Sequence, residues 1–257
     1  MITYLLINLF SVICINLIGF SIAYRKKTDK LTDFSYALSF ITLAVVSLVL
    51  SGNLNAPNVL LVVLVTAWAL RLGSYLVIRI RRWGRDARFD EIRNNARKFL
   101  GFWVLQALTA WCVMIAPQLF LWQNQSNQLG QPSYLGLIIF AFALTFEAVA
   151  DYQLYRFTGA SENKGRFINK GLWKYSRHPN YFGEIMVWLG AWVYTLSALA
   201  LPQKVIGFIT PLTIYVMIRF ISGVPKLEKS AEKKWGEDAD YQAYKKRTGL
   251  LIPKPRL

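Results

Sequence analysis

Seven long apolar segments, separated by polar connections, constrain this chain more than any other feature. They cover residues 2–24, 33–51, 57–80, 99–122, 133–155, 181–200 and 203–221. A helix needs about 20 predominantly apolar residues to cross the hydrocarbon core of a bilayer. Because 54% of the 257 residues are hydrophobic, the chain carries more apolar surface than a soluble domain of this size can bury. The sequence therefore predicts an all-α integral membrane bundle of seven transmembrane helices.

The basic residues alternate between the connections of this predicted bundle. Lys and Arg number four in residues 25–30, eight in 79–98, six in 156–177 and nine from Lys226 onward, whereas the connections 51–58 and 123–133 have none. Cytoplasmic connections of membrane proteins carry an excess of Lys and Arg. The alternation predicts an N-terminus outside and a cytoplasmic C-terminus.

The net charge of +16 could also indicate a nucleic-acid-binding protein. Such a protein has no reason to place its charge on alternate connections of a membrane bundle, so we exclude nucleic acid as a partner. The anionic inner leaflet explains the basic connections more simply. We expect an integral protein of the bacterial inner membrane whose active-site face is cytoplasmic and whose partners include membrane lipids.

The chain is expected to form one membrane domain over residues 1–257. Residues 1–56 would supply N-terminal helices, and residues 57–257 a core that ends in a cytoplasmic tail from residue 226. The first apolar segment has no basic region in front and no small-residue cleavage site behind, so it reads as a span rather than a cleaved signal. Cys14 and Cys112 lie in predicted spans and form no disulfide framework or metal-ligand pattern.

Polar side chains, most of them ionisable, recur within or at the start of three of the predicted spans. Each set has a spacing of four residues, which places its members on one helix face. The sets are Arg71, Tyr75 and Arg79 in the third span, Glu147 and Asp151 in the fifth, and Asn180 and Glu184 in the sixth. Such residues are costly in a membrane and usually face a polar cavity or a partner. We expect the three stripes to surround one polar pocket that opens toward the cytoplasm.

Two explanations of these stripes remain open. The charges could pair with one another and only join helices, although small residues together with Ser or Thr would serve that purpose. Alternatively, they could bind a ligand with several charges. The cations Arg79, Arg156, Arg166 and Arg177 suit phosphates, and the carboxylates suit ribose hydroxyls or amides. This combination favours a nucleotide cofactor, without the glycine-rich fingerprint of a Rossmann site or a P-loop.

The segment Gly171-Leu-Trp-Lys-Tyr-Ser-Arg-His-Pro-Asn-Tyr-Phe-Gly-Glu184 has the highest density of polar chemistry. It contains His178, the only histidine of the chain, followed by Pro179 at the entry to the sixth span. Arg177 and His178 thus stand at a predicted helix N-terminus, where backbone N–H groups favour an anion. The segment is a candidate cofactor-binding loop.

This loop, together with Phe146-Glu-Ala-Val-Ala-Asp-Tyr-Gln153, resembles the bacterial branch of the steroid 5-alpha-reductase superfamily. Trp68-Ala-Leu-Arg71-Leu, Arg85-Asp-Ala-Arg88-Phe and the closing stretch from Tyr241 to Pro253 also match. The resemblance covers roughly residues 60 to 253. It implies a seven-helix membrane reductase that binds NADPH from the cytoplasm and reduces a carbon–carbon double bond in a lipophilic, steroid-like or other lipid substrate.

The resemblance also implies which residues bind the cofactor. The matching positions are Arg71, Tyr75, Asp151, Arg166 and Asn180, with Glu184 near the nicotinamide and Arg177 and His178 added by the bacterial form of the loop. Arg79 and Glu147 join the set as neighbours on the same helix faces. One departure concerns the substrate, because steroid reductases hold its carbonyl with a Gln-Glu pair that Ser51-Gly-Asn-Leu-Asn55 lacks.

The sequence leaves the proton donor and the reaction class open. Tyr75, Tyr181 and Glu184 are candidates for the catalytic acid that hydride transfer requires. The Arg-His-Pro-Asn-Tyr loop also occurs in isoprenylcysteine carboxyl methyltransferases, so a membrane methyltransferase that uses S-adenosylmethionine is the alternative. The abundance of arginine favours NADPH, which is the more anionic cofactor. A transporter or a structural membrane subunit is a third possibility, although transporters place polar groups near the bilayer midplane.

Overall fold

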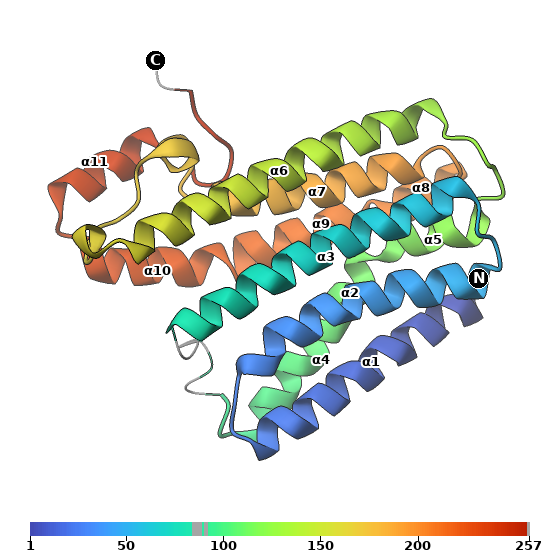
Figure 1. Ribbon diagram of the computed structural model, residues 1–257, viewed down its shortest axis with the longest axis horizontal. Helices are drawn as coiled ribbons and strands as arrows, with labels where there is room; N and C mark the ends of the chain where they lie inside the picture. Colours follow the sequence, from blue (N-terminus) through green and yellow to red (C-terminus); the bar gives the residue numbers. More distant parts are fainter. Residues whose placement is uncertain (84–88, 90–91, 256–257) are drawn as a thin grey trace. The chain divides into compact units, whose positions relative to one another are not determined.

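The computed structural model describes residues 1–83, 89 and 92–255, and of residues 80–83 only the backbone. Figure 1 shows that the described chain is built from helices and irregular connections. No β-strand occurs in these ranges, and an isolated parallel bridge joins Ser176 to Gly249. The predicted all-α class is therefore confirmed. Of the predicted motif at residues 85–89, only Phe89 lies among the described residues.

Eleven α-helices are present in the described part of the chain. They are α1 Ile2–Arg25, α2 Lys30–Ser51, α3 Ala56–Trp83, α4 Ala96–Val113, α5 Ile115–Gln123, α6 Gln131–Gly159, α7 Pro179–Thr195, α8 Leu201–Gly207, α9 Ile209–Val216, α10 Val224–Trp235 and α11 Ala239–Arg247. Shorter elements are the 3-10 helices η2 Ser161–Asn163 and η3 Gly171–Lys174, and the π-helix η4 Met217–Ile221.

Five helices are long and apolar enough to cross a membrane, or six if the bent pair α4 and α5 forms one span. The protein is thus a helical membrane protein, but the seven predicted spans are not all reproduced. The difference lies in α7, which covers the sixth predicted span with 17 residues. This length is at the lower limit for a bilayer-spanning helix.

The fourth predicted span is broken between α4 and α5, which meet at an angle of 46°. Pro117 lies in the first turn of α5. Because proline has no N–H, it cannot donate to the carbonyl of Val113, the residue at which α4 ends. The missing donor interrupts the helical hydrogen bonds at this break.

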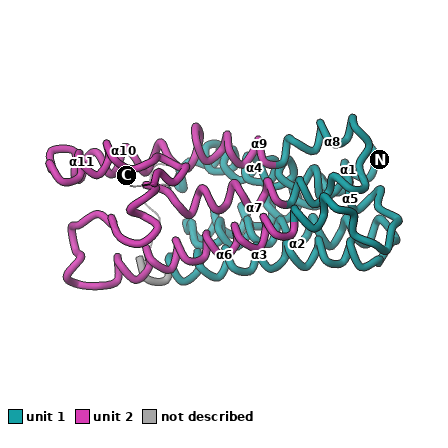
Figure 2. The backbone as a smooth tube through the Cα atoms, turned by 90° about the horizontal axis from the view of Figure 1, so that it is seen from above, with its two compact units in different colours: residues 1–136, 191–210 teal, residues 137–190, 211–257 magenta. Residues whose placement is uncertain are grey.

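The chain divides into two compact units, drawn in different colours in Figure 2. Unit 1 comprises Met1–Gly136 and Ala191–Thr210, and unit 2 comprises Leu137–Gly190 and Pro211–Leu257. The expectation of a single membrane domain stays a prediction.

In unit 1, α1 packs against α2 and α4, and α2 packs against α3 and α5. Buried amides and hydroxyls join three of these helices. Nδ2 of Asn16 on α1 donates to Oγ of Ser39 on α2 at 2.9 Å, and Nε2 of Gln106 on α4 donates to Oδ1 of Asn16 at 2.9 Å. Such bonds are typical of helix association in membranes, where apolar contacts alone give little specificity.

In unit 2, α6 contacts α7, and the helical chain runs from α9 through η4 into α10. The predicted tail is helical in α10 and α11, and its aromatic side chains form a cluster with Phe167. The ring centroid of Phe167 lies 6.0 Å from that of Trp235, 5.2 Å from Tyr241 and 5.3 Å from Tyr244. The tail thus packs on the connection between α6 and α7.

Candidate functional site

Helices α6 and α7 approach each other closely at Glu147 and Gly183. A Cβ atom on Gly183 would lie 2.7 Å from Cβ and 2.9 Å from Cα of Glu147. Only glycine tolerates such an approach, since real Cβ contacts are longer. Gly183 belongs to the Asn-x-x-Gly-Glu pattern of the sequence, and its missing side chain brings the polar stripes of the two helices together.

One turn away, the two stripes make a direct hydrogen bond. Nδ2 of Asn180, in the first turn of α7, donates to Oδ1 of Asp151 on α6 at 3.1 Å. Asp151 is 4% exposed and Glu147 only 2%. Two carboxyl groups, four residues apart on α6, are therefore nearly excluded from solvent beside an amide of the candidate cofactor loop.

The loop before α7 is anchored on α6 by its first residues. Gly171 has a φ of 59°, a left-handed conformation that favours glycine. The turn lets the backbone N–H of Leu172 donate to Oε1 of Gln153 at 2.9 Å. Nε1 of Trp173 donates to the carbonyl of Ala150 at 3.0 Å. These two bonds attach the start of the loop to α6 at Ala150 and Gln153, which flank Asp151 in the chain.

The C-terminal segment binds the same loop through its backbone. The N–H of Arg177 donates to the carbonyl of Gly249 at 2.8 Å, and the N–H of Gly249 donates to the carbonyl of Tyr175 at 3.2 Å. Oγ of Ser176 donates to the carbonyl of Leu251 at 2.7 Å. The tail that follows α11 therefore acts as a short extended segment against residues 175–177.

A tyrosine of α11 adds a side-chain anchor. The hydroxyl of Tyr244 donates to the carbonyl of Trp173 at 2.7 Å, and Tyr244 is buried. Burial raises the pKa of the Tyr244 phenol above its ordinary value, because the charged form would lose its solvation. The neutral phenol is thus the form that holds the loop at physiological pH.

Glu228 of α10 holds the side chains of Arg177 and His178 in the loop. One of its carboxylate oxygens accepts from Nη1 of Arg177, and the other lies 2.7 Å from Nε2 of His178. The ring of His178 stacks on that of Tyr181, with centroids 5.8 Å apart and an interplanar angle of 25°. Tyr181, a candidate acid, is half-buried on α7, as is Glu184.

Two buried polar atoms near this loop have no hydrogen-bond partner among the described residues. They are Nε of Arg177 and Oγ1 of Thr248. Buried polar groups in folded proteins are almost always satisfied, so such atoms call for an explanation such as a water or a ligand. Nε of Arg177 is a donor of fixed positive charge, and the donor chemistry therefore fits an anionic group.

The remaining predicted cations of unit 2 lie at its surface. Arg156, near the end of α6, and Arg166, in the connection after η2, are exposed. The structure gives neither side chain a contact with Asp151 or Asn180.

The predicted stripe of the third span belongs to α3 in unit 1. Arg71, Tyr75 and Arg79 are half-buried there. Nη2 of Arg79 lies 3.5 Å from Oδ2 of Asp33 on α2. This acidic partner, at the cytoplasmic end of the predicted second span, was missed by the sequence analysis. The convergence of Arg71, Tyr75 and Arg79 with the residues of unit 2 stays a prediction.

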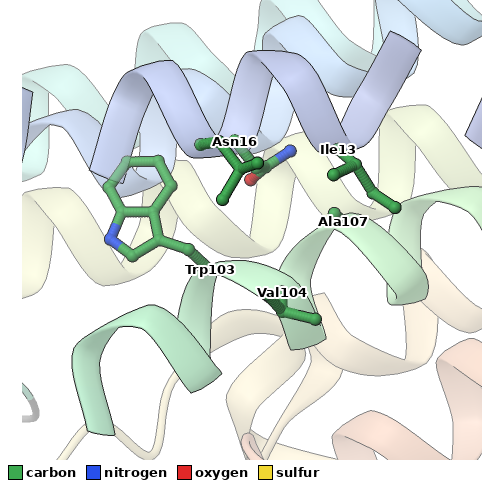
Figure 3. Close-up of a pocket in the computed structure, with 6 residues that line it drawn as sticks. Ile13, Asn16, Trp103, Val104 and Ala107 are labelled. Atoms are coloured by element: carbon green, nitrogen blue, oxygen red, sulfur yellow. The ribbon is translucent and has the colours of Figure 1, made fainter. Parts of the chain in front are cut away.

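Unit 1 also contains a small cavity between α1 and α4, shown in Figure 3. Its volume is about 50 Å³, and it is lined by Ile13, Asn16, Leu17, Trp103, Val104 and Ala107. Ligand pockets are several times larger, so this space does not suit a nucleotide. None of the predicted site residues lines it.

Glu228 is the main site residue that the reductase interpretation missed. On α10 it shares a helix face with Val224, Ala231 and Trp235, which are buried or half-buried, while most of the lysines around them are exposed. An acidic residue on the apolar face of an amphipathic helix is a signal that could have identified it. Among the described residues, no three His, Cys, Asp or Glu side chains could hold a metal ion together.

The fold and this site define a helical membrane protein with buried carboxylates and a tethered Arg-His loop in unit 2. More specifically, residues 19–248 match a family described as a protein of unknown function, DUF1295. Because the match covers most of the chain, the protein belongs to this family. No curated protein and no solved structure matches the chain.

Proposed function

We propose that this protein is an NADPH-dependent membrane reductase that transfers hydride to an activated carbon–carbon double bond of a lipophilic substrate. The observation that carries the proposal is the buried carboxylate of Asp151, which accepts from Asn180 next to the Arg177–His178 loop. Buried ionisable groups at the cytoplasmic ends of predicted spans are costly and mark functional sites. The sequence resemblance to steroid 5-alpha-reductases supplies the reaction class.

The donor and acceptor set of unit 2 supports a nucleotide cofactor. Asp151 and Glu147 provide acceptors for ribose hydroxyls or a carboxamide, and Asn180 provides an amide. Arg177 and the exposed Arg166 provide cations for phosphates, and a buried Nε of Arg177 has no partner in the described part of the chain. NADPH, when bound, supplies the hydride.

The chain's own residues would then hold the proton and exclude water. Tyr181 and Glu184 lie half-buried on α7, within about one turn of Asn180, and together with Tyr75 they are the candidates for the catalytic acid. The apolar helices would keep the reacting carbon away from water and admit a greasy substrate from the bilayer. The substrate class is therefore a lipid-soluble alkene next to an electron-withdrawing group.

The proposal includes the topology of the bundle. Seven spans would place the N-terminus outside and the basic connections, the loop before α7 and the tail in the cytoplasm, following the charge alternation. In this arrangement α7 serves as a short sixth span, and the apolar part of Leu201–Trp235 serves as the seventh, while α10 continues beyond the membrane.

One observation favours a second candidate, a methyltransferase that uses S-adenosylmethionine. Glu228 neutralises the charge of Arg177 and also contacts His178, which lowers the number of cations available for phosphates. S-adenosylmethionine carries no phosphate, so its binding site needs fewer cations. The two cofactors are therefore the alternatives that binding measurements must separate.

The replacement Asp151→Ala tests the reductase proposal. The purified variant should insert and fold, but its Kd for NADPH should rise at least about tenfold because a buried acceptor of the cofactor is lost. Glu162→Ala, which removes an exposed acid of η2 in the same unit, is the matched control and should bind like the unmodified protein. Unchanged NADPH affinity in Asp151→Ala would remove Asp151 from the site and the main support of the proposal.

A further inference from the structure

Glu228 connects the tail to the candidate site through two separate donors. Its carboxylate contacts the guanidinium of Arg177 and the imidazole of His178, which are neighbours in the chain. The side chains of Arg177, His178 and Glu228 are 13%, 8% and 23% exposed. Because all three are largely withdrawn from water, the carboxylate is not an interchangeable surface partner.

The contact extends from His178 to the first turn of α7. The imidazole stacks on the ring of Tyr181, and Tyr181 also packs against the backbone where α10 begins. A Cβ atom on Gly223 would lie 3.1 Å from Cε2 of Tyr181. The phenol of Tyr181 is therefore held between the imidazole that Glu228 fixes and the residue that precedes α10.

The loop backbone is independently fixed, which separates the role of Glu228 from that of a general scaffold. Arg177, Ser176 and Tyr175 are bound through backbone or hydroxyl groups by the segment after α11. Glu228 makes no contact with these backbone groups among the interactions described. Glu228 therefore acts through the side chains of Arg177 and His178 and, through the ring of Tyr181, on the first turn of α7.

We propose that Glu228 is a positioning residue of this site: it orients Arg177 and His178 and, through the imidazole, the phenol of Tyr181, before any cofactor binds. This inference rests on the proposed function for its consequence, the pre-organisation of the cofactor-binding loop. Groups that are held in their bound geometry spend less binding free energy on ordering. Glu228 itself need not touch the cofactor.

The test compares Glu228→Ala and Glu228→Gln with Glu232→Gln in the full-length protein. Glu232 is one turn further along α10, where it is exposed and accepts from Lys245 and Gln242, so its replacement is a matched control. Hydrogen exchange of residues 176–184 without ligand reports the order of the loop. Titration with NADPH reports the consequence for binding.

We expect the amides of residues 178–182 to exchange about tenfold faster in Glu228→Ala, because two buried donors lose their acceptor and the first turn of α7 opens more often. The Kd for NADPH should rise by a similar factor. Glu228→Gln keeps one acceptor oxygen, so its exchange rate and its Kd for NADPH should lie between those of Glu228→Ala and of the unmodified protein. A variant that failed to fold would not show this intermediate behaviour. Glu232→Gln should change each by less than about twofold.

The outcomes separate this inference from the proposed function. If exchange of residues 176–184 and NADPH affinity in Glu228→Ala match those in Glu232→Gln, the positioning role is wrong. If exchange increases only in the Glu228 variants while the unmodified protein binds no NADPH, the positioning role holds and the reductase proposal fails. If Glu228→Ala does not fold, hydrogen exchange and NADPH affinity are compared between Glu228→Gln and Glu232→Gln, and the same outcomes decide.

Discussion

Asp151 is the residue on which the chemistry of unit 2 depends most. Its carboxyl group is nearly excluded from solvent on α6, one turn after Glu147, and Nδ2 of Asn180 donates to it. A buried carboxylate without donors would be costly, and a fold that needed only helix contacts would use smaller polar groups. The presence of Asp151 and Glu147 on one face of α6 supports the proposal of a ligand that both residues contact.

Replacement of Gly183 tests the close contact between α6 and α7. In Gly183→Ala the added methyl group would meet the backbone of Glu147, so α6 and α7 must separate. We expect a loss of about 1–3 kcal/mol in the free energy of unfolding, together with weaker NADPH binding, because the Asn180–Asp151 hydrogen bond spans the same interface. Thermal denaturation and NADPH titration of the purified variant measure both effects.

Gly101→Ala is the control for this replacement, since nothing lies within 4 Å of a Cβ atom at Gly101 on α4. In that helix the substitution should be neutral or slightly stabilising. Equal stability of the two variants would contradict the close approach of α6 and α7.

At the scale of elements, the structure shows which interactions order the loop before α7. Its start is bound to α6, its end to the segment after α11, and the side chains of Arg177 and His178 to α10. A connection of this length would ordinarily be mobile. Here three elements distant in sequence remove that freedom, which is the condition for a site with fixed geometry.

A truncation tests the contribution of the C-terminal segment. A chain that ends at Thr248 loses the carbonyls of Gly249 and Leu251, which accept from Arg177 and Ser176. We expect trypsin to cut the truncated protein several times faster after Lys174 and Arg177, because local opening of the loop becomes cheaper. Time courses of limited proteolysis, with the fragments identified by mass spectrometry, provide the measurement.

A chain that ends at Lys254 is the matched control, because it retains all the backbone hydrogen bonds to Tyr175 and Arg177. It should be cut at the rate of the full-length protein. If both truncations behave alike, the segment after α11 does not order the loop.

Local features of the helices could be predicted from the sequence, whereas contacts between distant residues could not. Apolar length predicted the helical membrane class and the candidate spans that the structure contains, because it is a local property of the sequence. The four-residue spacing identified Glu147 and Asp151 on one face of α6. The partnership of Glu228 with His178 could not be derived, because it joins residues 50 positions apart and depends on how the tail packs. The Arg79–Asp33 pair could not be derived either, because it joins residues 46 positions apart on two different helices.

At the scale of the whole molecule, the charge alternation predicts the side of the membrane on which the site lies. In a background without Cys14 and Cys112, Asn127→Cys in an outer connection should react with a membrane-impermeant maleimide on intact cells. Lys170→Cys, in the loop before α7, should react only after the membrane is permeabilised. Both positions are exposed in the structure, so a difference in labelling reports the side of the membrane rather than the burial of the residue. The reverse labelling pattern would contradict the proposed orientation.

Whether this protein binds a phosphate-bearing nucleotide is best decided by side-by-side titration of the purified full-length protein with NADPH, NADH and S-adenosylmethionine. We expect saturable binding of NADPH, weaker binding of NADH because one phosphate is missing, and no measurable binding of S-adenosylmethionine. Saturable binding of S-adenosylmethionine with none of NADPH would contradict this expectation and establish the methyltransferase alternative.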